Sequence, residues 1–140
     1  MEVTGEVLFA GTARGPLLKL AAPISFWGGV DPATGLITDV RHPDHGACIT
    51  GTILALPGTI GSSSSSSVLL ELIHRAKAPA ALLLQDVDAI LLIGLIIAQE
   101  MALPTPPALR LLKVNFASLP QGIYYVSQQG ILTLETGGHG

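Results

Sequence analysis

Short apolar runs separated by glycine- and proline-containing turns make up most of this chain. Runs of this length that are rich in aliphatic and β-branched residues are typical of strands. The first two runs are expected to pair with each other, and turns are expected at 31–35 and 128–130. The predicted strands are residues 6–10, 17–21, 24–27, 36–40, 49–57, 78–84, 108–114, 123–126 and 131–134.

Two segments have helical periodicity instead. Directly after a serine run, four apolar residues recur at the spacing of one helix face: Val68, Leu69, Leu72 and Ile73. Residues 86–102 carry a second set of overlapping apolar faces, and Gly94 at their centre predicts two short helices that meet at that glycine. The proline-rich segment 104–107 ends this region.

Many strands and two or three helices, in mixed order, predict a compact α/β domain with a largely closed β core. A length of 140 residues suits one domain with a substantial core. We expect this domain to span residues 1–135 and residues 136–140 to form a disordered tail.

The serine run, Ser62 to Ser67, follows Gly61 and precedes the first predicted helix. Composition alone would favour a flexible linker. The apolar runs on both sides instead predict a tight strand–loop–helix junction, in which some serines cap the helix and others fill its first turn. Two interpretations stay open: a capping loop without chemistry, or a helix N-terminus that holds an anion such as carboxylate or phosphate.

Two polar loops precede this junction. In the first, the adjacent Gly28 and Gly29 allow close approach of the backbone to another group. In the second, residues 41–46, His42 and His45 lie three positions apart, but a turn with no regular third donor makes a zinc site the weaker interpretation. A pocket-lining role is the stronger one, with Arg41, His42 and Asp44 as candidate polar contacts for a ligand.

Composition narrows the class of protein. The chain is 49% hydrophobic and 12% charged, with a mean hydropathy of +0.57. The apolar run 89–98 is too short for the roughly 20 residues that span a bilayer. The apolar surplus instead indicates surface that is buried against a partner protein, although a compact core could absorb part of it. A net charge of −3 with 7 Lys and Arg residues and no basic cluster argues against nucleic-acid binding.

The single cysteine, Cys48, excludes an internal disulfide and cannot hold a metal cluster by itself. Its apolar neighbours predict a buried structural thiol. No charged segment leads into an apolar stretch at the start of the chain, so no signal peptide is predicted and the expected location is cytoplasmic.

Three segments together resemble the small subunit, or swivelling domain, of the aconitase X family. They are residues 27–35 with Asp39 and His42-Pro43, the junction 61–67, and residues 78–81 leading to Gly94. The resemblance covers about residues 5–107. It implies a β/β/α swivelling domain similar in fold to the mobile domain of aconitase.

The resemblance also implies a hydro-lyase that is active only as a heterodimer. A large partner chain would carry the cysteines for an iron–sulfur or iron centre and much of the pocket for a small carboxylate substrate. This chain would supply a serine base, which the family pattern places at Ser62, directly after Gly61. The other implied substrate-binding residues are Gly61, Ser63, Ser64, Gly28, Gly29, Asp31 and His42.

Two dehydrations are associated with this family, that of cis-3-hydroxy-L-proline and that of phosphomevalonate in the mevalonate pathway. The unbroken serine run and the scarcity of lysine favour the first, with phosphomevalonate as the alternative. A non-catalytic anion-binding or assembly module is a further alternative. A phosphoryl-carrier domain is disfavoured, because no histidine lies in the junction and His74 falls at the far end of the helix.

Overall fold

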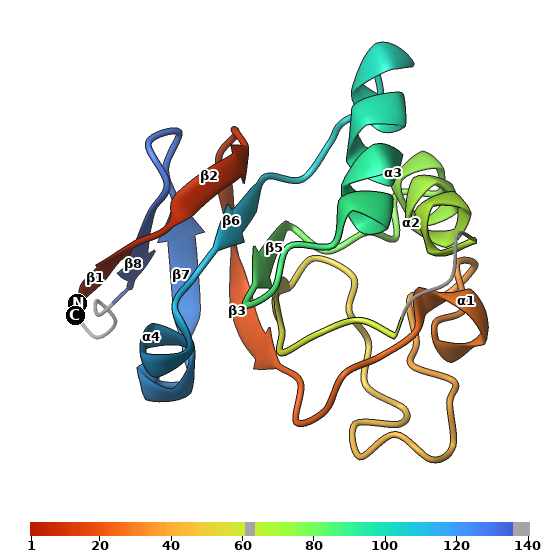
Figure 1. Cartoon of the computed structure of the whole chain (residues 1–140), viewed down its shortest axis with the longest axis horizontal. Coiled ribbons are helices and arrows are strands. Elements are labelled where there is room, and N and C mark those ends of the chain that lie inside the picture. The colour runs from red at the N-terminus through yellow and green to blue at the C-terminus, as the bar shows by residue number, and fades with distance from the viewer. Residues whose placement is uncertain (61–63, 136–140) are drawn as a thin grey trace.

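The computed structural model describes residues 1–60 and 64–135 of the chain, which form one mixed α/β domain (Figure 1). The helices are α1 (Phe26–Gly29), α2 (Ser65–His74), α3 (Ala89–Glu100) and α4 (Lys113–Ser118). The strands are β1 (Glu2–Thr4), β2 (Glu6–Phe9), β3 (Ala13–Lys19), β4 (Ile53–Leu56), β5 (Ala81–Leu84), β6 (Ala108–Arg110), β7 (Ile123–Val126) and β8 (Ile131–Leu134).

The described strands form one sheet in the order β1-β8-β7-β3-β4-β5-β6-β2. Strands β3 to β6 run parallel, and the remaining pairs are antiparallel. The two end strands, β1 and β2, are separated in sequence by Gly5 alone, whose N–H donates to Gly130 O at 2.9 Å. Because one residue joins the two edges, the sheet must curl back on itself, which confirms the predicted α/β domain with a largely closed β core.

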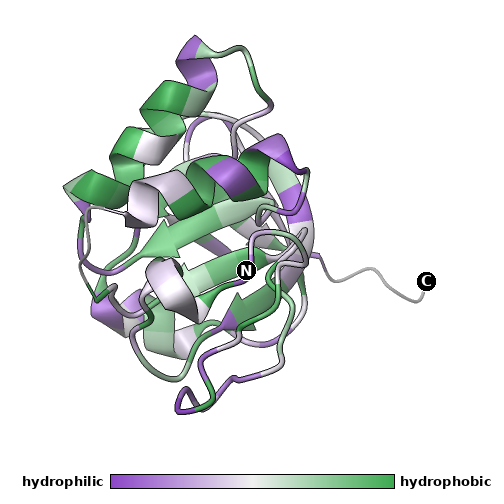
Figure 2. Ribbon diagram, turned by 90° about the vertical axis from the view of Figure 1, so that its right-hand side faces the viewer, coloured by the Kyte–Doolittle hydropathy of each residue, from purple (hydrophilic) through white to green (hydrophobic). Residues whose placement is uncertain are grey.

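The central parallel strands β4 and β5 are buried on both faces, as such strands usually are. One set of alternating side chains, including Ile53 and Ala55 of β4, packs inside the curled sheet with Leu17 and Tyr124. The other set, including Leu54 and Leu56, packs under α2 and α3. Figure 2 shows apolar strands beneath these helices. The period of two along β4 therefore divides the core between two layers.

Helix α3 is continuous, so the prediction of two short helices that meet at Gly94 is wrong. A Cβ atom at Gly94 would lie 2.9 Å from Ser66 O and 3.4 Å from Leu69 Cβ. The glycine is therefore the point at which α2 crosses α3 at close range, and the missing side chain serves packing rather than a break.

Several predicted strands need correction. Strands β2 and β3 do not pair with each other, since β2 pairs with β6 and β3 with β4 and β7. Residues 24–27 and 36–40 are not strands: Phe26–Gly29 forms α1, and the remaining pairing there consists of isolated bridges. The strand predicted at 108–114 ends at Arg110, and Lys113–Ser118 forms a further short helix, α4, whose Phe116 is buried in the core.

The prediction of a buried thiol is also wrong, because Cys48 is exposed. Cys48 forms an isolated antiparallel bridge with Leu36, and the burial alternates along the chain so that the next residue, Ile49, faces the core. The apolar residues next to Cys48 therefore do not indicate the direction in which its own side chain points.

Candidate functional site

Four parallel strands end at one edge of the sheet, and the candidate site lies there. The arrowhead of β3 points to this end of the molecule, where α1 and α4 also lie (Figure 1). The chain passes from β4 into α2 and from β5 into α3, so both longer helices start at the same edge. In α/β sheets, ligands bind outside the carboxyl ends of the parallel strands.

The strand–loop–helix junction predicted around the serines is confirmed. Strand β4 ends at Leu56, Ser64 is the N-cap of α2, and Ser65, Ser66 and Ser67 fill the first turn. Ser64 O accepts the Val68 N–H at 3.2 Å. The predicted base Ser62, together with Gly61 and Ser63, lies outside the described residues, so its role stays a prediction.

The loop before the serines is tied to the start of α3. The Thr59 hydroxyl donates a hydrogen bond to Asp88 Oδ2. The other carboxylate oxygen, Asp88 Oδ1, accepts the N–H groups of Ile90 at 2.9 Å and Leu91 at 3.2 Å and so caps α3. One carboxylate therefore holds the β4–α2 loop and a helix N-terminus in register.

Two adjoining hollows open at this edge. The first, of about 410 Å³, is lined by Gly58, Thr59 and residues 86–90. The second, of about 470 Å³, is lined by Pro57, Gln85, Asp86 and residues 110–113. Asp86 lines both, so the hollows form one mouth beside the start of α3.

Sequence reasoning did not identify the charged residues that line this mouth: Asp86, Asp88, Arg110 and Lys113. Arg110 lies within 3.7 Å of Glu6 Oε1, and its Nε donates to Gln85 O at 3.3 Å. The available signal was their position: each follows or ends a buried apolar run that became a parallel strand. Polar residues at such ends meet at one edge of the sheet.

The structure brings the predicted glycines Gly28 and Gly29 to the junction. Helix α1 packs against α2, and the Ile24 backbone runs beside the β4–α2 loop. Ile24 N donates to Gly58 O at 3.3 Å, and Ile60 N donates to Ile24 O at 3.0 Å. Gly28 has φ +78, and a Cβ atom there would meet nothing within 4 Å, so its backbone is open to an approaching group.

The other two predicted contacts have structural partners of their own. Asp31 starts the predicted turn: its Oδ1 accepts the Ala33 N–H at 2.9 Å, and its carbonyl accepts the Gly35 N–H at 2.8 Å. His42 is 7% exposed. Its Nδ1 accepts the Asp44 N–H at 3.0 Å and its Nε2 donates to Ala22 O at 3.0 Å. Substrate contacts by Asp31 and His42 stay predictions, and both residues order the loop that precedes β4.

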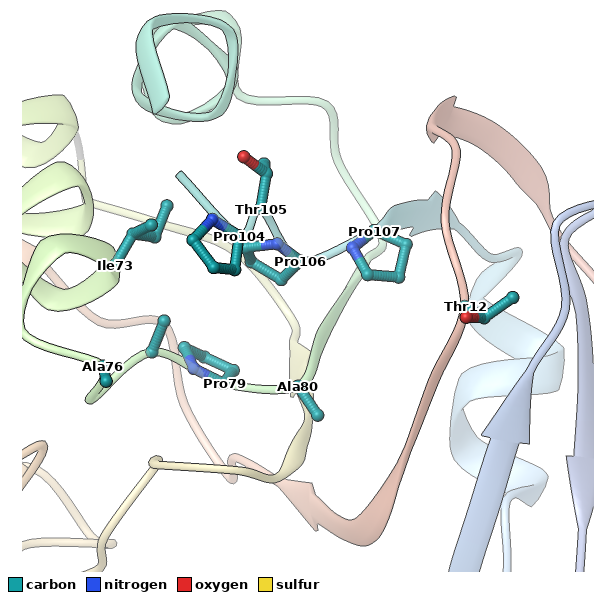
Figure 3. A pocket seen from close by; sticks show the side chains of 10 residues that line it. Thr12, Ile73, Ala76, Pro79, Ala80, Pro104, Thr105, Pro106 and Pro107 are labelled. Carbon is teal, nitrogen blue, oxygen red and sulfur yellow. The ribbon is translucent and has the colours of Figure 1, made fainter. Parts of the chain in front are cut away.

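The opposite edge of the sheet holds a hollow of different character. Figure 3 shows it between the end of α2 and the segments that enter β5 and β6. The prolines Pro79, Pro104, Pro106 and Pro107 line it, and among the described residues that line it only Thr12 and Thr105 have polar side chains. None of these described lining residues is charged or has an ordinary role in proton transfer.

The described residues contain neither a metal-binding cluster nor a helix that could span a membrane. Within residues 1–60 and 64–135, no three His, Cys, Asp or Glu side chains gather into a group that could hold a metal ion. Among the described helices, none combines the length and apolar character that a bilayer crossing needs.

Known proteins resemble this chain over nearly its whole length. A family model described as the aconitase X swivel domain matches residues 2–133. The crystal structure of Thermococcus kodakaraensis aconitase X in its holo-form matches with a TM-score of 0.84 at 30% identity, covering 97% of this chain and 99% of that one.

Curated relatives carry two different names. "Cis-3-hydroxy-L-proline dehydratase" of Pseudomonas aeruginosa is 48% identical over 99 residues, which are 71% of this chain and 17% of that protein. The enzyme of the same name from Hypocrea jecorina is 37% identical over 129 residues, which are 92% of this chain and 22% of that protein. "Phosphomevalonate dehydratase small subunit" of Methanothermobacter thermautotrophicus is 42% identical over 98 residues, which are 70% of this chain and 75% of that protein. The chain therefore matches about a fifth of each hydroxyproline dehydratase and three quarters of the archaeal small subunit.

Proposed function

The chain belongs to the aconitase X swivel domain family, and from this premise we propose that it is the small subunit of a two-chain dehydratase. The match of the family model to residues 2–133 is the observation that carries the proposal. The position of the serine junction agrees with it, since the chain passes from the carboxyl end of β4 into α2 and the loop between them lines a hollow at Gly58 and Thr59.

The proposed reaction removes water from a hydroxylated carboxylate substrate. A base takes the proton from the carbon next to the carboxylate, the electrons of that C–H bond form a C=C bond, and the neighbouring C–O bond breaks to release the hydroxyl. The proton and the hydroxyl leave as one water molecule. We assign the base to Ser62 and the binding of the substrate carboxylate to Ser63, Ser64 and the backbone N–H groups of the first turn of α2.

A serine hydroxyl holds its proton at neutral pH, so its proposed role as a base needs an environment that stabilises the deprotonated oxygen. The start of α2 provides part of it, because the helix dipole favours negative charge at that end. Exclusion of water would strengthen these interactions, which requires a second protein surface over the mouth. Hence the proposal includes a larger partner chain.

The described residues do not fit an iron centre, because they offer no cluster of ligands and Cys48 stands alone on the surface. We place the iron–sulfur or iron centre in the partner chain, on that chain's cysteines. Every step given above uses groups of this chain and the substrate alone.

For the substrate we propose cis-3-hydroxy-L-proline first. The support is the 48% identity to the bacterial enzyme of that name, compared with 42% to the archaeal small subunit. One observation favours the alternative, phosphomevalonate: Arg110 and Lys113 line the second hollow and would supply the positive charge that a phosphate group requires. Both substrates share the carboxylate that the start of α2 would bind.

The test is to purify this chain alone and together with the large aconitase X-type chain of the same organism, and to assay both substrates. We expect no turnover and no iron in the isolated chain, and dehydration of cis-3-hydroxy-L-proline by the pair. Turnover by the isolated chain would contradict the subunit assignment. A stable pair that dehydrates neither substrate would favour a non-catalytic anion-binding module.

A further inference from the structure

His42 is a buried side chain that the proposed reaction does not use. The side chain is 3% exposed. Its Nδ1 accepts the Asp44 N–H at 3.0 Å, so this nitrogen carries no hydrogen, and its Nε2 donates to Ala22 O at 3.0 Å. An imidazole of this kind has one donor and one acceptor. Both are occupied within the chain, which leaves neither ring nitrogen for a substrate.

The two bonds of His42 differ in reach. Asp44 follows His42 by two residues, so the Nδ1 bond closes a local turn. Ala22 precedes His42 by 20 residues and lies in the segment that joins β3 to α1. In the same place, Asp44 Oδ2 accepts the N–H of Ala21 at 2.8 Å. The loop 39–46 therefore holds the segment 20–22 at two adjacent residues.

The held segment leads directly to Ile24, whose backbone lies against the loop before the serines. Ile24 N donates to Gly58 O at 3.3 Å, and Ile24 O accepts the Ile60 N–H at 3.0 Å. These bonds make a parallel bridge between Ile24 and Thr59. Only Pro23 separates Ala22 from Ile24, so the position of Ala22 constrains the backbone that holds this loop.

A second anchor holds the same loop from another side. The Thr59 hydroxyl donates to Asp88 at the start of α3. The loop 58–60 is therefore fixed between the segment 20–24 and α3. Because the loss of one anchor leaves the other in place, a change at His42 should open this region locally and leave the fold intact.

We propose that His42 is a positioning residue: through Ala22 and Ile24 it fixes the loop 58–60, by which the chain enters the serine junction. The consequence for turnover rests on the proposed function, in which Ser62 is the base, whereas the tether rests on the bonds described above. A reacting group that is displaced by about 1 Å can lose about 100-fold in rate. His42 therefore governs turnover without touching the substrate.

Two substitutions separate the two bonds of His42. The amide nitrogen of a glutamine can take the place of Nε2, and the amide oxygen of an asparagine can take the place of Nδ1. His42→Gln therefore keeps a donor for Ala22 O and loses the acceptor of the Asp44 N–H. His42→Asn does the reverse. His45→Asn, at an exposed position of the same loop, is the matched control.

The first measurement is amide hydrogen exchange in the full chain alone. The amides of Ile24 and Ile60 report the opening of the bonds between the held segment and the loop. We expect His42→Asn to raise both exchange rates at least about 10-fold, and His42→Gln and His45→Asn to change them less than about 3-fold. The Leu82 amide, which donates to Pro107 O at 2.9 Å, should keep its rate in every variant.

Asp44→Ala tests the tether without a change at His42. It removes the bond to the Ala21 N–H and should also raise the exchange rates of Ile24 and Ile60. Thermal melts show whether each variant folds. If His42→Asn does not fold, unchanged exchange in Asp44→Ala would overturn the tether, and faster exchange would support it.

The second measurement is kcat in the assembled two-chain enzyme. We expect His42→Asn to lower kcat about 10–100-fold and His42→Gln to keep it within about 3-fold. A side chain that only fills space would not produce this difference, because both substitutions put a smaller polar group in place of the ring. Rescue by glutamine alone would therefore assign the effect to the bond with Ala22 O.

The outcomes separate the tether from the proposed function. Faster exchange in His42→Gln but not in His42→Asn would place the role in the turn at Asp44 and overturn the proposal. An equal loss of kcat in both variants with unchanged exchange at Ile24 would make His42 a substrate contact and overturn it as well, as would unchanged exchange and kcat in both. The expected exchange pattern in a pair of chains that dehydrates neither substrate would support the tether and contradict the proposed function.

Discussion

Gly94 of α3 lies directly against the backbone of Ser66 in α2, so close that a Cβ atom at Gly94 would stand 2.9 Å from Ser66 O. Ser66 belongs to the first turn of α2, the turn that begins the candidate site. The glycine therefore sets how near α3 approaches the serine junction. Because Asp88 also caps α3 and accepts the Thr59 hydroxyl, the helix is tied to the junction at two points.

Gly94→Ala tests this crossing. Alanine favours a helix over glycine by about 1 kcal/mol. Overpacking a close contact costs about 1–3 kcal/mol, and a backbone oxygen cannot rotate out of the way as a side chain can. We expect the free energy of unfolding, measured in urea, to fall by about 1–2 kcal/mol. Gly11→Ala, whose Cβ atom would lie 3.4 Å from Pro107, is the control and should change stability by less than about 0.5 kcal/mol.

The C-terminal ends of α2 and α3 offer a stabilising change. Ala76 and Ala102 follow the two helices with φ of +58 and +57, a left-handed conformation that costs a residue with a Cβ about 1–2 kcal/mol. Lys77 N bonds to Leu72 O at 2.8 Å, as expected for a helix end of this kind. Glycine relieves this strain, but it also increases the conformational entropy of the unfolded chain, which offsets part of the stabilisation. Ala76→Gly and Ala102→Gly should therefore each raise the free energy of unfolding, measured in urea, by about 0.5–1 kcal/mol.

The contrasting control is Ala117→Gly in α4, an exposed helical position that should lose about 0.5–1 kcal/mol. Destabilisation by all three glycine substitutions would show that the two helix ends carry no such strain.

Ser65→Ala tests a buried hydroxyl in the first turn of α2. Ser65 is 2% exposed, and among the described residues its Oγ finds no hydrogen-bond partner. A buried, unsatisfied hydroxyl costs about 1–3 kcal/mol, part of which its removal recovers. We therefore expect Ser65→Ala to raise the free energy of unfolding by about 0.5–1 kcal/mol in urea titrations. A loss of more than about 1 kcal/mol would mean that the hydroxyl makes a bond that stabilises the fold.

Ser62→Ala tests the proposed base in the assembled two-chain enzyme. Loss of a general base should lower kcat about 10²–10⁴-fold while the complex still forms. Ser67→Ala is the matched control: it removes the same group from an exposed position in the first turn of α2 and should change kcat less than about 3-fold. Near-normal kcat for Ser62→Ala would place the base elsewhere.

Tyr124 predicts a pH dependence of stability. Its hydroxyl donates to Pro120 O at 2.6 Å, and burial raises the pKa of Tyr124 above its ordinary value. The unfolded chain therefore ionises this tyrosine first, near pH 10, and its contribution to stability is complete below that pH and is lost as the pH rises above it. Urea unfolding at pH 7 and at pH 11 should show Tyr124→Phe less stable at pH 7 by about 1 kcal/mol, because Pro120 O loses its donor. The gap should narrow at pH 11, and an unchanged gap would contradict the assigned direction.

The sequence by itself located most of the local structure. The apolar runs marked the central strands β4, β5, β7 and β8, and the four-residue stripe from Val68 to Ile73 marked α2. The turn at 31–35 and the serine junction also followed, because proline, glycine and serine act on the backbone within a few residues of themselves. These features depend on neighbours along the chain, which a sequence displays directly.

Only the tertiary structure decided which surfaces meet. Gly94 looked like a helix break until α2 supplied the backbone that it accommodates, and Cys48 looked buried until its pairing with Leu36 turned it outward. Strands β1 and β2 close the sheet through partners that are distant in sequence, such as Thr133 for Glu2 and Arg110 for Glu6. Asp86, Asp88 and Arg110 form one mouth because parallel strands end together at one edge. Such contacts join segments that are distant along the chain, so the local pattern around each residue carries no signal of them.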